Sequence, residues 1–255
     1  MAKNTCAICG AEVNLITGQA LADKQYICRK VCGKKCLKDF NKVEATLGDV
    51  TAHIAQVERG TKIWNEVLLP LKNSKNKEEK LKGFYNSSGA DLFVSPTTGL
   101  CAYVETRYKI FIFGKTEHAC VYRIADLYGY EYESEKVKNS EGKEETKHYC
   151  VFLFNNTAGL YTFRMQISTQ KAYEEIEKYF DTLFGIQKTL GNMANNWKNQ
   201  MNAIKAAAGA VKSAADGTLD EAQAANAAGA IDTAVHGDRS ELIAKADAIL
   251  ANYPG

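Results

Sequence analysis

Five cysteines within the first 36 residues constrain this chain more than any other feature: Cys6, Cys9, Cys28, Cys32 and Cys36. The spacing of two residues between Cys6 and Cys9 is that of a zinc knuckle, in which a tight turn brings two thiolates onto one ion. A second cysteine pair would complete a tetrahedral four-cysteine site. A segment of about 40 residues has too little hydrophobic core to fold without a cross-link such as a metal site, so we expect a metal ion here.

Two choices are open for the second pair. We favour Cys28 and Cys32, because Cys28 directly follows the apolar, strand-like residues 25–27, which we expect to form a short hairpin with residues 13–16. The alternative pairs Cys32 with Cys36 on one helix face, which makes Cys36 the alternative fourth ligand. Four protein thiolates leave no coordination position for water, so the sequence predicts one structural zinc ion per chain.

The other cysteines, Cys101, Cys120 and Cys150, lie in strand-like segments and are expected to be buried and reduced. The N-terminus lacks the apolar core of a signal peptide, and no run of about 18 apolar residues predicts a membrane span. We therefore expect a cytoplasmic protein, a compartment in which clustered cysteines hold metal more often than they form disulfides.

Charge and composition divide the chain into four segments. Residues 1–40 form a cysteine-rich segment, residues 41–82 a helical connector and charged linker, residues 83–185 a strand-rich domain, and residues 186–255 an alanine-rich helical tail with 19 alanines. A net charge of +2 excludes a uniformly basic nucleic-acid binder. The first 90 residues alone carry 15 basic and 9 acidic side chains, a net +6, so the zinc module remains a candidate for phosphate contacts.

The strand-rich segment predicts an antiparallel β-barrel or sandwich. Short pieces rich in valine, isoleucine, phenylalanine and tyrosine follow one another without intervening helices: residues 100–106, 108–114, 119–124, 128–133, 148–154 and 159–167. The charged residues 134–147 are expected to be a solvated loop. A helix with one apolar face then follows over residues 170–184, capped by Ser168 or Thr169.

A seven-residue apolar repeat runs from this helix into the tail. Its members are Ile176, Leu183, Leu190, Trp197, Ile204 and Val211. The repeat suggests that the helix continues from residue 170 to residue 212, although Gly185 is a candidate break. Two further helices are expected over residues 219–235 and 239–251. The seam either packs within a small bundle of these helices or accepts a partner helix or a second copy of the chain.

The first 36 residues resemble a family of uncharacterised bacterial proteins. The run CAICGAEVNLITGQALADKQYIC is similar to an N-terminal zinc-ribbon-like domain, the domain of unknown function numbered 4428 (DUF4428), although that family has two residues between the last two cysteines and this chain has three. In such proteins a bacterial PH-like domain often follows, and residues 84–184 fit its outline of short strands and one helix. The resemblance implies a PH-like barrel with a C-terminal capping helix. Because of the different spacing at the second cysteine pair, Cys36 stays a candidate for the fourth ligand, and His53 is a remote further candidate.

We find no catalytic signature around the four histidines, His53, His118, His148 and His236. The expected fold class is therefore α+β, and the expected function is a non-enzymatic zinc-binding adaptor that meets a protein partner or itself through the helical tail. One alternative is a nucleic-acid-associated protein that uses the basic zinc module. A second alternative is lipid binding at a membrane surface through the PH-like domain.

Overall fold

The computed structural model describes residues 4–86, 89–108, 114–139, 142–155, 160–185 and 239–254. In the N-terminal module, β1 (Asn4–Thr5) pairs with β2 (Glu12–Val13), and β3 (Gly18–Ala20) pairs with β4 (Tyr26–Cys28). The predicted hairpin is therefore displaced, since β4 pairs with β3 and not with residues 13–16. The reason is a turn in which the carbonyl of Asn14 accepts a hydrogen bond from the Gly18 N–H at 2.8 Å.

A helical connector follows the short helix α1 (Cys32–Lys35). Helix α2 (Leu47–Ile63) continues into a π-helical turn, η1 (Trp64–Leu68), and then into α3 (Leu69–Lys72). The helix expected in the connector of residues 41–82 therefore begins at Leu47. Thr46 fixes this start, because its side chain accepts from the Asp49 N–H at 3.3 Å while the Asp49 carboxylate accepts from the Thr46 N–H at 2.8 Å.

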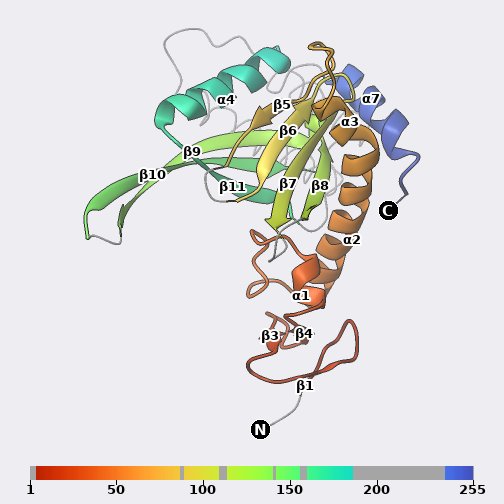
Figure 1. Cartoon of the computed structure of the whole chain (residues 1–255), viewed down its shortest axis with the longest axis vertical. Coiled ribbons are helices and arrows are strands. Elements are labelled where there is room, and N and C mark those ends of the chain that lie inside the picture. Colours follow the sequence, from red (N-terminus) through yellow and green to blue (C-terminus); the bar gives the residue numbers. More distant parts are fainter. Residues whose placement is uncertain are drawn as a thin grey trace, which may run out of the picture. The chain divides into compact units, whose positions relative to one another are not determined.

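Two antiparallel sheets form the body of the protein (Figure 1). The first contains, in order, β5 (Lys82–Phe84), β6 (Asp91–Ser95), β7 (Leu100–Tyr108) and β8 (Lys115–Arg123). The second places β10 (Glu144–Phe154) between β9 (Leu127–Lys138) and β11 (Thr162–Ile167). The described residues therefore form a mixed α+β fold with open sheets and no closed barrel. A 3-10 turn at Ile124–Asp126 separates β8 from β9, which are not paired with each other.

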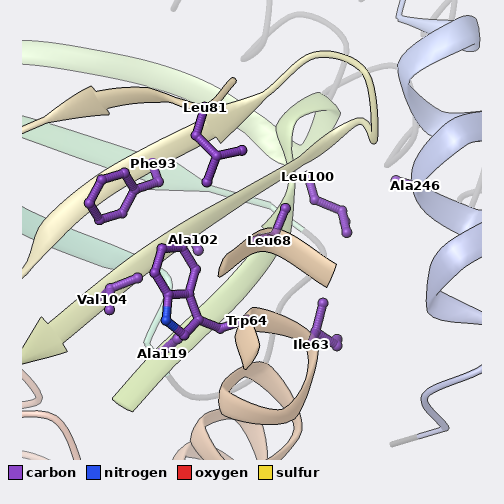
Figure 2. Close-up of a cluster of buried hydrophobic side chains, with 10 residues drawn as sticks. All are labelled: Ile63, Trp64, Leu68, Leu81, Phe93, Leu100, Ala102, Val104, Ala119 and Ala246. Atoms are coloured by element: carbon purple, nitrogen blue, oxygen red, sulfur yellow. The ribbon is translucent and has the colours of Figure 1, made fainter. Parts of the chain in front are cut away.

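The four-stranded sheet is covered on both faces, because alternate side chains of a strand point to opposite sides. Tyr103 and Tyr122 point toward the second sheet, where their rings stack on Phe163 at 3.9 Å and on Phe154 at 4.3 Å between centroids. The opposite face packs against the helical connector and the last helix, α7 (Ser240–Leu250) (Figure 2). The buried residues of this second layer are Ile63, Trp64, Leu68, Leu81, Phe93, Leu100, Ala102, Val104, Ala119 and Ala246.

The hairpin of β9 and β10 is longer than the sequence predicts. Residues 134–147 were expected to form a solvated loop, but the ladder continues to the pair Lys138 and Glu144, well past the last pairing of β11 with β10 at His148 (Figure 1). The loop expectation is wrong because it rested on charge. A two-stranded ribbon that is solvated on both faces carries charged side chains without any cost of burial.

The structure divides into two compact units, Met1–Tyr173 with Leu242–Gly255, and Glu174–Glu241. The predicted helix after the strands is confirmed as α4 (Gln170–Leu183), with the Thr169 hydroxyl accepting from the Ala172 N–H at 3.3 Å. Of the two possibilities left open, a continuous helix to residue 212 or a break at Gly185, the structure shows the break, because α4 ends at Leu183 and Gly185 adopts a left-handed φ of 68°. The later seam residues and the helix expected over 219–235 lie outside the described residues.

Candidate metal centre

Four cysteine side chains converge in the N-terminal module. The Sγ atoms of Cys6, Cys9, Cys28 and Cys32 all lie within 4.8 Å of one another. Two of their separations are 3.8 Å, between Cys6 and Cys32, and 3.6 Å, between Cys9 and Cys28. The knuckle turn after Cys6, strand β4 and the start of α1 supply these ligands, so residues far apart in sequence meet at one point.

The separations fit a tetrahedral metal site. Four thiolates about 2.3 Å from a central Zn²⁺ lie about 3.8 Å from each other, since that is the edge of such a tetrahedron. The two sulfur–sulfur distances of 3.6 and 3.8 Å agree with this edge. They are far longer than a disulfide bond of about 2.05 Å. The four cysteines are therefore thiols arranged around a point that a metal ion can occupy.

Backbone N–H groups stabilise negative charge on two of the sulfurs. The Cys28 N–H donates to the Cys6 Sγ at 3.2 Å, and the Cys32 N–H donates to the Cys28 Sγ at 3.3 Å. Burial raises the pKa of Cys6, but N–H groups that include those of Cys9 and Cys28 lower it to about 6. Burial raises the pKa of Cys28 too, and the Cys32 N–H brings it below the usual range.

Deprotonation of the Cys32 thiol depends on a bound cation. Burial and then the neighbouring thiols of Cys28, Cys9 and Cys6 raise the pKa of Cys32. Without an ion, four sulfurs this close repel one another once they are charged, so some remain protonated. A divalent metal removes this conflict, because it deprotonates coordinating thiols and neutralises part of their charge. Protein ligands then fill all four positions, which makes such a site structural and not catalytic.

Cys36 is not a member of the four-sulfur group. Its side chain is buried, and burial raises the pKa of its thiol. His53 is also placed apart from the group, since its Nε2 accepts the Leu37 N–H at 3.1 Å and its Nδ1 lies 3.1 Å from the Gln56 Oε1. Both ring nitrogens are thus engaged in holding the connector, so His53 is a packing residue.

A buried polar network attaches the metal module to the four-stranded sheet. The Glu105 carboxylate accepts the Lys38 N–H at 2.7 Å and pairs with the Arg107 Nε at 2.5 Å. Arg107 also donates to the carbonyl of Lys34 and, at 2.7 Å, to that of Cys36. These bonds hold the segment directly after the last ligand. Sequence reasoning missed both residues, because a charged pair inside a strand pattern is usually a solvated edge.

The remaining sequence candidates are structural. Cys101, Cys120 and Cys150 are buried, as predicted. Burial lowers the pKa of the half-buried His118, which lies opposite Glu105 on the neighbouring strand. His148 lies 2.6 Å from the Tyr132 hydroxyl through its Nδ1. These residues therefore contribute to packing of the sheets, and they do not converge on one site.

Comparisons of the sequence with family models, with curated proteins and with solved structures give no match. The site is therefore interpreted from its own geometry. Among the helices of the described ranges, none has the length and apolar character that crossing a bilayer requires.

Proposed function

We propose that Cys6, Cys9, Cys28 and Cys32 bind one structural Zn²⁺ and that the chain is a non-enzymatic adaptor. The mutual approach of four Sγ atoms within 4.8 Å carries the proposal. Zinc is the ion of choice, because it favours tetrahedral thiolate sites and has no redox chemistry. Binding it supplies folding free energy to a module whose strands contain only two or three residues each.

Elemental analysis of purified variants tests the ligand set. The wild-type chain is expected to carry one zinc, and Cys32→Ser is expected to lose it, because a serine hydroxyl is a poor replacement for a thiolate. Cys36→Ser is the matched control, since it removes a buried cysteine of the same module that lies outside the sulfur group. Loss of zinc from Cys36→Ser together with its retention in Cys32→Ser would contradict the assignment.

The adaptor role extends the proposal to the other segments. Two packed antiparallel sheets followed by the helix α4 support a PH-like domain, although the sheets stay open. PH-like folds serve many binding roles, so the fold alone names no ligand. A helix over residues 190–211 would carry the seven-residue repeat as an apolar stripe for a partner helix or a second copy of the chain.

Charged substitutions in the seam test this assembly role in the full-length chain. Truncation is unsuitable, because it would remove α7, whose Ala246 is buried in the second layer of the core. We expect Leu190→Lys with Ile204→Lys to weaken self-association or partner capture by at least about tenfold. Asn199→Lys adds a charge outside the seam and is the control. Unchanged mass by light scattering and unchanged capture in the double variant would refute the assembly role.

A further inference from the structure

The most exposed apolar side chains of the described residues include a pair on the metal module. Leu15 and Ile16 stand next to each other and are 80% and 82% exposed. Val31, 59% exposed, follows two residues after Arg29, whose N–H donates to the carbonyl of Thr17 at 2.9 Å. We call Leu15, Ile16 and Val31 the apolar tip. Covering such exposed apolar side chains removes their surface from water, which is favourable.

Local hydrogen bonds close the turn that carries Leu15 and Ile16. The Asn14 Oδ1 accepts from the N–H groups of Ile16 at 2.9 Å and Thr17 at 3.0 Å, and the Asn14 N–H donates to the Thr17 hydroxyl at 3.0 Å. Val31 lies in the segment between Cys28 and Cys32, two members of the four-sulfur group. Local hydrogen bonds and the four-cysteine site therefore present the apolar side chains in one fixed arrangement, so little conformational entropy is lost when they are covered.

The surroundings of the tip indicate what covers it. Arg29 and Lys30 are exposed, the Arg29 N–H bonds to the Thr17 carbonyl, and Val31 follows Lys30 in the chain. Within residues 11–19 and 29–31 the only carboxylate is Glu12. An apolar projection flanked by basic side chains matches the edge of an anionic bilayer, where the acyl boundary accepts the apolar groups and the headgroups attract the cations.

Other occupants match the tip less well. A stable protein interface uses about 20 to 30 residues on each side, whereas the tip has three apolar side chains on a projecting turn. Nucleic acid would use Arg29 and Lys30 but would leave Leu15 and Ile16 in water. We propose that the metal module docks peripherally on an anionic membrane surface by inserting Leu15 and Ile16, with Arg29 and Lys30 against the headgroups. This proposal goes beyond the adaptor role and does not depend on the helical tail.

Vesicle sedimentation of the full-length, zinc-loaded protein tests the proposal. We expect binding to phosphatidylcholine vesicles that contain phosphatidylserine and little binding to phosphatidylcholine alone. Leu15→Ser with Ile16→Ser should lower the partition coefficient at least about tenfold, since both insertion side chains are lost. Val43→Ser is the matched control, because Val43 is a 64% exposed apolar residue outside the tip. Equal binding of the tip variant and this control would overturn the proposal.

A charge-reversal pair tests the second half of the contact. Arg29→Glu with Lys30→Glu should abolish the preference for phosphatidylserine, whereas Lys75→Glu with Lys77→Glu changes net charge equally at two exposed linker positions and should keep it. Zinc content is measured for every variant, so that a failed metal site is distinguished from a failed tip. A gel shift with duplex DNA in the absence of vesicle binding, or a dimer that the tip substitutions dissociate, would refute membrane docking.

Discussion

His53 shows how a titratable side chain is used for packing. It is fully buried, its ring stacks on Phe40 at 4.2 Å between centroids, and both of its nitrogens have partners. Burial lowers its pKa from 6.5 to about 4; the Gln56 side chain and Glu105 oppose this shift, while Lys42 adds to it. The neutral ring is therefore the form that the native structure requires.

A pH dependence of stability follows from this burial. Between pH 6.5 and 4 the unfolded chain binds a proton at His53 that the native chain does not, so the free energy of unfolding falls as the pH falls. The difference between a pKa of 6.5 in the unfolded chain and about 4 in the native chain corresponds to about 3 kcal/mol of unfolding free energy. Urea unfolding of wild type and His53→Gln across this range measures it. Parallel pH profiles of the two proteins would contradict the burial of a neutral imidazole.

At the residue scale, the sequence predicts the cysteine ligands better than the residues that hold their segment in place. The spacings of Cys6, Cys9 and Cys28 follow from the geometry of a knuckle and a strand, so they are readable without a structure. The role of Arg107 is not, because it depends on the approach of the Lys34 and Cys36 carbonyls from a different segment. Such long-range pairings leave no local pattern in the chain.

Gly60 determines how closely α2 lies against β8. A Cβ atom at this position would lie 2.3 Å from the carbonyl oxygen of Ala119 and 2.9 Å from the backbone nitrogen of Val121. The Thr61 hydroxyl accepts the Ala119 N–H at 3.0 Å beside this contact. Glycine in the middle of a helix costs about 1 kcal/mol, and here the close approach of two backbones compensates for that cost.

We expect Gly60→Ala to destabilise the fold by about 2–3 kcal/mol, because the helix must move away from the strand. Gly48→Ala in the same helix is the control, since its nearest neighbour, the Thr46 Oγ1, would be 3.6 Å away. That control should gain up to about 1 kcal/mol from helix propensity. Chemical denaturation measures both changes. A neutral Gly60→Ala would show that the helix does not need this close contact.

Elements with a clear apolar pattern in the sequence were predicted, whereas the features that depend on tertiary contacts were not. The strand character of β7 and β8, which rests on their β-branched and aromatic residues, and the apolar face of α4 follow from the sequence alone. The extension of β9 and β10 to the pair Lys138 and Glu144 does not, because charged residues are equally typical of a loop and of a solvated ribbon. The break after α4 was only a candidate, since a glycine marks a helix end only where its φ is positive.

The metal module and the sheet behave as parts of one unit, because residues 34–39 bind β7 through buried polar groups. Besides the Arg107 contacts, the Tyr103 hydroxyl donates to the Asp39 carboxylate. The second sheet and the connector meet in the same unit through Gln56, whose Nε2 donates to the Leu160 carbonyl at 3.1 Å. Changes in the module should therefore reach the stability of the whole fold.

Arg107→Ala tests this coupling. It leaves the buried Glu105 carboxylate without its cation, and arginine holds the pKa of this carboxyl below its usual range against the effect of burial. We expect a loss of about 2 kcal/mol of unfolding free energy. Lys35→Ala, which removes the exposed pair with Glu58, should leave it nearly unchanged. Equal effects in denaturant titrations would show that the network does not connect module and sheet.

The central claim is that four cysteine thiolates of this chain surround one zinc ion. X-ray absorption at the zinc edge tests it most directly, because the spectrum counts sulfur and nitrogen ligands and measures their distances. We predict four sulfurs at about 2.3 Å in the wild type and the same shell in Cys36→Ser. Three or fewer sulfurs, an imidazole nitrogen in the first shell, or a changed shell in Cys36→Ser would contradict the account.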